Sequence, residues 1–193
     1  MMMPLDAMGG VPDDVLLARF AAGEARAAQA LTARLLPRVL AQATRMLNER
    51  AEAEDVAQKA MLRLWRVAPD WQAGRAQVST WLYRVTANLC LDRLRRRAHL
   101  PLEAAPEPYQ ARGAPDALQD KARAAALQAA LGALAPRQRL AVVLRHLEGL
   151  GNPEIAEIMD ISPEAVESLT ARGKRALGAA LAGRREELGY DDE

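Results

Sequence analysis

The stretch from Asn152 to Leu169 reads NPEIAEIMDISPEAVESL and decides how the C-terminal part of the chain folds. Its apolar side chains recur where two short helices that cross at a tight turn must bury them: Ile155, Met159, Ile161, Val166 and Leu169. Ala156 stands where the two helices would touch most closely, and Asp160 occupies the turn, where Asp tolerates left-handed backbone. The stretch therefore predicts a helix-turn-helix rather than an arbitrary helical hairpin.

Both helices of this motif have the same start signal. Asn152 precedes Pro153 and Ser162 precedes Pro163, so a capping side chain is followed by proline at the first helical position, where its missing amide is harmless. We expect the second helix to cover residues 163–182.

This second helix should have two distinct faces. The residues expected to point inward are Val166, Leu169, Gly173, Ala176 and Leu177. The residues expected to point outward are Glu164, Glu167, Ser168, Ala171, Arg172, Lys174 and Arg175. In a major groove the cationic side chains can meet phosphates or guanine edges, and Glu164 or Glu167 can accept from a cytosine amino group. Each charge is explained about as well by a solvated surface side chain.

The composition favours helix along the rest of the chain. Of the 193 residues only 4% are aromatic, and Ala, Leu, Arg and Glu dominate, so the propensities favour helix over sheet. We expect an all-α protein with helices near residues 13–22, 24–47, 52–68, 79–97, 117–133, 136–147, 153–159 and 163–182.

A break in the helical periodicity divides the chain into two small domains. Its helix-breaking residues are Pro101, Pro106, Pro108, Gly113 and Pro115. We expect a first domain of residues 1–98, a flexible linker of residues 99–116 and a second domain of residues 117–193. Because the prolines favour extended backbone, this linker should be able to hold the two domains well apart.

Several classes of site are not expected. Cys90 is the single cysteine, so no intramolecular disulfide can form, and there is no grouping of Cys and His with zinc-ligand spacing. We expect no metal and no cofactor. Neither an export signal nor a membrane-spanning stretch is indicated, so the expected location is a reducing cytoplasm.

The charge is concentrated rather than large. The net charge is +1, but the segment from Arg84 to Arg97 holds five arginines against one acidic residue, Asp92. A short basic segment of this kind is typical of nucleic-acid contact.

The helix around AEDVAQKAMLRLWR, residues 53–66, also has two faces. Its buried stripe should comprise Val56, Ala57, Ala60, Met61 and Leu64. The opposite face should carry Asp55, Gln58, Leu62, Trp65 and Arg66. Leu62 and Trp65 are costly to leave in water, so this mixed face is typical of a partner surface. Trp65 could equally well lie at the edge of the domain core.

The helix around VSTWLYRVTANLCLDRLRRR, residues 78–97, places one aromatic, one amide and several charges on a shared stripe: Trp81, Arg84, Asn88, Asp92 and Arg95. Unpaired bases offer stacking faces and exposed edges to such a stripe. Trp81 could instead be packed in the core. Arg95, Arg96 and Arg97 are more simply explained as phosphate contacts.

These three segments, in this order, resemble the extracytoplasmic-function sigma factors of bacterial RNA polymerase. The resemblance covers nearly the whole chain and implies two domains, sigma region 2 and sigma region 4, joined by a short linker. It implies that the chain directs the core polymerase to promoters, which have minus-10 and minus-35 elements, and promotes DNA melting there. It also implies control by an anti-sigma factor.

The resemblance assigns roles to residues of this chain. Asp55, Gln58, Leu62 and Arg66 would bind the clamp helices of the beta-prime subunit, and the beta subunit is a further expected contact. A minus-10 base would be flipped into a pocket formed by the loop of residues 71–77, which includes Gly74, and the start of the next helix. The minus-10 residues would be Gly74, Trp81, Arg84, Asn88, Asp92, Arg95, Arg96 and Arg97. The minus-35 residues would be Glu164, Glu167, Ser168, Arg172, Lys174 and Arg175.

The sequence departs from the family pattern at two places. Lys59 stands where an acidic residue is usual, so the ion pairing with polymerase should differ. Glu167 and Leu169 stand in the recognition helix where many relatives carry Lys and Arg, so the minus-35 preference should be unusual or the non-specific affinity lower.

Two other functions remain possible at this point. A two-domain helix-turn-helix regulator that does not bind core polymerase would share the C-terminal motif, but it has no reason to carry the basic helix of residues 78–97. A small helical enzyme has less support, because His99, His146 and Cys90 form no paired catalytic arrangement. Cys90 sits among apolar neighbours, where an inert thiol is expected. We therefore expect the chain not to be an enzyme.

Overall fold

The computed structural model describes residue 8 and residues 10–74, 76–98 and 115–182. Within these ranges the elements are helices and turns, with no strand. The helices are α1 (Asp13–Ala21), α2 (Ala25–Leu47), α3 (Arg50–Val67), α4 (Val78–Ala98), α5 (Pro115–Ala133), α6 (Pro136–Val142), α7 (Asn152–Met159) and α8 (Pro163–Ala182). A short 3₁₀ turn, Ala68–Asp70, follows α3, and a π-helical turn, Val143–Leu147, continues α6. The predicted all-α class is confirmed, with helix ends within about two residues of those expected.

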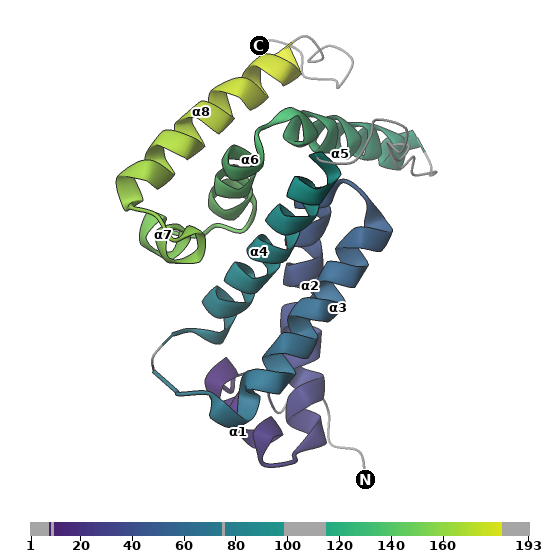
Figure 1. Ribbon diagram of the computed structural model, residues 1–193. Coiled ribbons are helices and arrows are strands. Elements are labelled where there is room, and N and C mark those ends of the chain that lie inside the picture. The colour runs from purple at the N-terminus through teal and green to yellow at the C-terminus, as the bar shows by residue number, and fades with distance from the viewer. Residues whose placement is uncertain (1–7, 9, 75, 99–114, 183–193) are drawn as a thin grey trace.

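The first domain is built from the long helices α2, α3 and α4, with α1 covering one end (Figure 1). The stripe predicted for α3 is buried, with Val56, Ala60 and Leu64 at most 2% exposed. α2 ends at Asn48, whose φ of 56° is left-handed, and the Glu49 side chain then caps α3 by accepting from the amides of Ala51 and Glu52 at 2.9 and 2.8 Å. A tight, capped corner therefore folds α3 back along α2.

The second domain contains the predicted helix-turn-helix. Ile155, Met159 and Val166 are buried, and Asp160 has a left-handed φ of 53° in the turn. The Ser162 hydroxyl accepts from the amide of Ala165 at 3.3 Å, as expected of a cap. Asn152 is not the predicted cap, because α7 already includes it, and the Gly151 amide instead donates to Glu154 Oε2 at 2.9 Å. Pro153 still marks the start of the helix, but it stands at the second helical position, so the helix begins one residue earlier than predicted.

α8 packs closely on α6 through a glycine. A Cβ on Gly173 would lie 2.6 Å from Val142 Cγ2 and 3.3 Å from the Gln138 carbonyl oxygen, so only glycine permits this approach. The inward residues predicted for α8 are buried or half-buried with one exception. This exception is Ala176, which is exposed.

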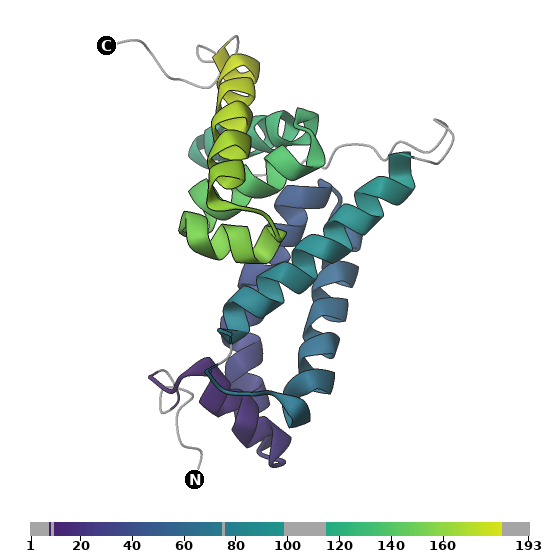
Figure 2. The ribbon, with the colours of Figure 1, turned by 60° about the vertical axis from the view of Figure 1, so that its left-hand side comes forward.

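The two domains are in contact (Figures 1 and 2). One apolar cluster contains buried residues of both, including Leu47 and Ala87 from the first domain and Leu140 and Ile155 from the second. The sequence predicted a linker able to hold the domains well apart; in this structure the two domains pack together through apolar faces. Residues 99–114 of the predicted linker lie outside the described residues.

Candidate functional site

The mixed face predicted on α3 lies at the surface. Gln58 and Arg66 are exposed, and Leu62 is 46% exposed, one of two large hydrophobic side chains exposed to this degree in the part of the chain that the structure describes. Trp65 is half-buried against Phe20, with the ring centroids 4.6 Å apart, so it belongs to the edge of the core. The available apolar anchor on this face is therefore Leu62.

Asp55 is already paired within the first domain. Its Oδ2 accepts from Lys59 Nζ and from Arg93 Nη2, both at 2.7 Å. The hydrogen bond from Lys59 is the main cause that lowers the pKa of Asp55 below its ordinary value. Lys59 thus forms part of a three-residue charged cluster, with Asp55 and Arg93, that fixes an ionised carboxylate on this face.

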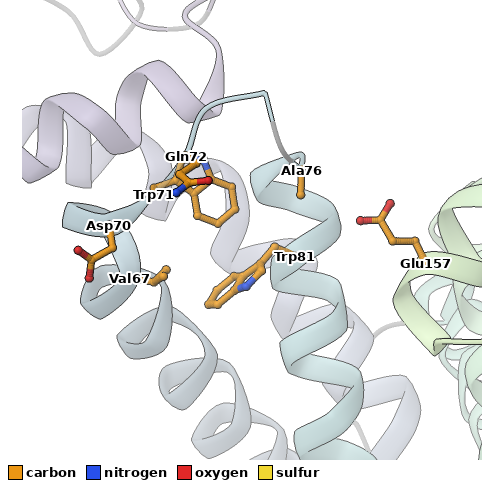
Figure 3. A pocket seen from close by; sticks show the side chains of 7 residues that line it. All are labelled: Val67, Asp70, Trp71, Gln72, Ala76, Trp81 and Glu157. Atoms are coloured by element: carbon orange, nitrogen blue, oxygen red, sulfur yellow. The ribbon is translucent and has the colours of Figure 1, made fainter.

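A cavity opens where the loop after α3 meets the start of α4 (Figure 3). It has a volume of about 370 Å³ and is lined by Val67, Asp70, Trp71, Gln72, Ala76, Trp81 and Glu157. Trp71 and Trp81 meet edge to face, with their ring centroids 5.9 Å apart. Gly74 lies in this loop with a φ of +81°, which a side chain rarely adopts. The cavity has aromatic walls and room for a planar group.

Sequence reasoning did not identify all residues around this cavity. Trp71 was assigned to the loop but not to the site, although its buried indole Nε1 has no hydrogen-bond partner within the described structure. Glu157 comes from α7 of the second domain, so only the tertiary arrangement brings it here. The sequence assigns no role to Arg93 beyond its basic charge, and its pairing with Asp55 joins α4 to α3.

The charged stripe on α4 continues from Trp81 toward the C-terminal end of the helix. Its exposed members are Arg84, Asn88, Asp92 and Arg95, and the neighbouring Arg96 is exposed as well. Arg95 is 3.5 Å from Asp92 in an ion pair along the helix. Arg97 differs from its neighbours, because it forms an ion pair with Glu52 and donates to the Leu47 carbonyl oxygen at 3.0 Å. Arg97 therefore joins α4 to the start of α3.

The outward face predicted for α8 is confirmed. Its exposed residues are Glu164, Glu167, Ser168, Ala171, Arg172, Lys174 and Arg175. Glu167 Oε1 accepts from Asn152 Nδ2 at 3.2 Å, and Arg172 Nε donates to the Ser168 carbonyl oxygen at 3.2 Å. The Ser162 hydroxyl and the backbone amide of Glu164 lower the pKa of the Glu164 carboxyl. This face thus offers carboxylates near the start of α8 and cations one to three turns later.

Other chemistry finds little support in the described residues. Cys90 is fully buried, and burial raises the pKa of its thiol to about 12, in agreement with the predicted inert thiol. No group of three or more His, Cys, Asp or Glu side chains in the described part could hold a metal ion. None of the described helices is long and apolar enough to span a membrane.

Two family models match the chain, one in each domain. The model described as Sigma-70 region 2 matches residues 31–99, and the model described as Sigma-70, region 4, matches residues 124–177. These ranges contain the α3 face, the cavity loop and α4 in the first case, and most of the helix-turn-helix domain in the second.

Similar proteins agree with these matches. ECF RNA polymerase sigma factor SigM of Mycobacterium tuberculosis is 34% identical over 170 residues, which cover 88% of this chain and 84% of that protein. ECF RNA polymerase sigma factor SigE of Mycolicibacterium smegmatis is 37% identical over 150 residues, which cover 75% of this chain and 58% of that protein. The chain thus spans less than two thirds of the length of some relatives that it matches.

A solved structure extends the similarity to the three-dimensional level. CnrH, in complex with the cytosolic domain of CnrY, is 29% identical and superposes with a TM-score of 0.65 over 89% of this chain and 97% of that chain. Sequence, domain order and fold agree, and the chain belongs to the extracytoplasmic-function (ECF) RNA polymerase sigma factors.

Proposed function

We propose that this chain is an alternative sigma factor that binds RNA polymerase core, recognises the minus-10 and minus-35 promoter elements and promotes DNA melting between them. The observation that carries the proposal is that three surfaces suited to these tasks occur in one chain: the α3 face, the cavity with the α4 stripe, and the outward face of α8. The polymerase supplies the catalysis, and this chain selects where it begins. Such a factor would act in the cytoplasm, where both its partners are found.

The α3 face supports core binding. Asp55, Gln58, Leu62 and Arg66 form a surface with an exposed apolar residue flanked by charges, which suits an anchor in a partner groove. The beta-prime clamp helices are the proposed partner of this face, and the beta subunit is a further proposed contact. Lys59 neutralises part of the charge of Asp55, so a basic partner should be attracted less strongly than by an isolated carboxylate.

The cavity and the α4 stripe support recognition of melted DNA. A base that leaves the duplex loses stacking, and an aromatic wall such as Trp71 and Trp81 can replace part of it. Arg84, Asn88 and Asp92 then continue along α4 with side chains that can read base edges. Arg95 and Arg96 fit phosphate contacts, and Arg97 would have to share its guanidinium with Glu52.

The α8 face supports minus-35 recognition in a major groove. Arg172, Lys174 and Arg175 supply cations for phosphates or guanine edges. Glu164, Glu167 and Ser168 lie nearer the start of the helix, which is the part that reaches base edges in helix-turn-helix proteins. Control by an anti-sigma factor, which the family resemblance implies, is also part of the proposal. The similar CnrH was solved in complex with a second protein, the cytosolic domain of CnrY.

A test is to reconstitute transcription with core polymerase. The chain should co-purify with core and start transcripts at defined sites, whereas a regulator that does not bind core would do neither. Leu62→Arg should weaken core binding at least about tenfold with helical content and melting temperature unchanged, because it inserts a charge into the proposed anchor. Val15→Arg is the matched control, since Val15 is similarly exposed, at 39%, but lies on α1. Normal core binding by Leu62→Arg would contradict the α3 assignment.

A further inference from the structure

The acidic side chains of α3 are all paired inside the first domain. Glu54 forms an ion pair with Arg50, one turn earlier in the same helix, at 2.7 Å. Glu52 forms an ion pair with Arg97, which reaches across from α4. Asp55 accepts from two cations at once. Every carboxylate of α3 therefore already has a cation beside it.

Asp55 and its two partners form a cluster with an excess of positive charge. Lys59 Nζ and Arg93 Nη2 both donate to the same oxygen, Asp55 Oδ2, at 2.7 Å. The hydrogen bond from Lys59, with a smaller contribution from Arg93, lowers the pKa of the carboxyl, so the carboxylate stays ionised between two cations. The Lys59 side chain is 52% exposed and that of Asp55 is 37% exposed. A cation that approaches from solvent therefore meets the ammonium group as well as the carboxylate, and repulsion offsets attraction.

α4 supplies most of this compensating charge. Arg93 and Arg97 are four residues apart, so they project from one side of α4 toward Asp55 and Glu52. Their side chains are only partly exposed, because both lie against α3. The N-terminal half of α3 is thus neutralised from within the first domain.

The C-terminal half of α3 is cationic and is not compensated in this way. Arg63 and Arg66 are exposed, and neither forms an ion pair within the part of the chain that the structure describes. Leu62, which is 46% exposed, lies on the same face as Lys59 and Arg66, three residues before it and four residues after it. Figure 1 shows α3 at the outside of the first domain, away from α7 and α8. Lys59, Leu62, Arg63 and Arg66, together the Leu62 surface, therefore present an apolar side chain among cations.

The Leu62 surface fits a protein partner of a particular charge. Arginine pairs with carboxylates through two parallel hydrogen bonds, and arginine is enriched at protein interfaces. An exposed leucine gains free energy when a partner groove covers it. Phosphates would also match the arginines, but a nucleic-acid backbone offers no apolar groove for Leu62. A groove with an apolar floor and an acidic rim satisfies both the leucine and the arginines.

We propose that α3 binds core polymerase through cations: Leu62 enters an apolar groove of the partner, and carboxylates at the rim of that groove pair with Arg63 and Arg66. Arg93 and Lys59 hold the Asp55 carboxylate within the chain, so Asp55 does not supply the main ion pair to the partner. The inference rests on the proposed function, because it names the charge of the surface that the core-binding face recognises.

The first test adds negative charge to the Leu62 surface and measures the affinity of the full chain for core polymerase without DNA. Arg63→Glu and Arg66→Glu should each weaken core binding at least about tenfold, because each sets a carboxylate against the acidic rim. Arg38→Glu is the matched control, since Arg38 is exposed on α2 beside Ser79 of α4. It makes the same charge change away from the Leu62 surface and should leave core binding unchanged.

The second test places opposite charges at one exposed position. Gln58 lies one turn before Leu62 on the same face and is neutral. Gln58→Glu should weaken core binding about threefold, and Gln58→Lys should strengthen it about threefold, if the facing rim is acidic. The two side chains are both long and flexible, so the sign of the difference reports charge rather than shape. Circular dichroism and the melting temperature verify that each variant is folded.

The third test removes the carboxylate that the cluster holds. Asp55→Asn frees Lys59 and Arg93 from their shared partner and makes the face more positive. It should raise the affinity for core polymerase about threefold, because the added positive charge attracts the acidic rim. An ion pair from Asp55 to a basic partner would give the opposite result, a loss of affinity.

The order of these affinities determines the polarity of the contact. Weaker binding by Gln58→Lys than by Gln58→Glu, or a loss of affinity in Asp55→Asn, would overturn the acidic rim. Normal core binding by Arg63→Glu and Arg66→Glu, with weaker promoter binding by the assembled complex, would assign these arginines to phosphates and also overturn the inference. A wild-type chain that does not bind core polymerase would instead contradict the proposed function, before any variant is compared.

Discussion

α8 and α4 carry similar sets of charged side chains, but the two helices use them differently. On α8, Arg172, Lys174 and Arg175 all face solvent. The Arg172 guanidinium donates to the Ser168 carbonyl oxygen, one turn earlier in the same helix. On α4, Arg93 and Arg97 are tied to Asp55 and Glu52 of α3. α8 lies at the outside of its domain, whereas α4 is packed between α3 and the second domain.

A helical wheel therefore gives the direction of a side chain but not its partner. A charge on an outer helix remains available to a ligand, whereas a charge between two helices is used to hold them together. The following substitutions test this distinction.

The largest effect is expected on the inner face of α8. Gly173→Ala should lower the free energy of unfolding of the second domain by about 3 kcal/mol, because the new Cβ would overlap Val142 and approach the Gln138 carbonyl. Gly178→Ala is the matched control, since nothing lies within 4 Å of its Cβ position, and it should stabilise the helix by about 0.5–1 kcal/mol. Urea unfolding followed by circular dichroism measures both. Equal effects of the two changes would show that α6 and α8 do not approach as closely as described.

A smaller effect is expected on the outer face of the same helix. Glu167→Lys should change the minus-35 preference at one position by about 1–3 kcal/mol, since a carboxylate on the groove floor selects a cytosine amino group. It should also raise non-specific DNA binding, because a phosphate-repelling charge is replaced by an attracting one. Selection from a randomised minus-35 library measures the preference. The same selected motif for wild type and variant would leave Glu167 as a surface charge held by Asn152.

Asn88, an exposed amide on α4, should contribute about as much free energy to base recognition as one hydrogen bond. Asn88→Ala should impair open-complex formation and relax the preference at one minus-10 base by about 1 kcal/mol. Permanganate footprinting reports the melting, and competition between promoter variants reports the preference. A uniform loss of affinity for all promoters would assign Asn88 to the backbone rather than to a base.

The smallest effects distinguish two neighbouring arginines. Arg97→Ala should lower the free energy of unfolding of the first domain by about 0.5–1 kcal/mol, because it removes the Glu52 pair and the bond to Leu47. Arg96→Ala should leave stability unchanged and instead weaken binding to all promoters alike, with a smaller salt dependence. Thermal unfolding and a salt titration of promoter binding separate the two. Matching stability losses would place both arginines in the same structural role.

Much of the fold follows from the sequence because its signals are local. The helix-turn-helix was predictable from the spacing of Ile155, Met159 and Val166 together with a turn residue that tolerates left-handed backbone. The buried stripe of α3 and the outward face of α8 follow from the 3.6-residue period for the same reason. Exposure on these helices is determined within a few turns of chain, so the candidate residues could be chosen before the tertiary structure was known.

The tertiary structure alone decided how these surfaces meet. The pairing of Glu148 with Arg45, the capping of α2 by Gln128 and the place of Glu157 beside Trp81 each join residues that lie more than 70 positions apart. No periodicity relates such positions, because they come together only when one folded domain packs on another. The helical periodicity of the sequence specifies which residues face outward, and the packing of the two domains sets which of those residues stay accessible in this structure.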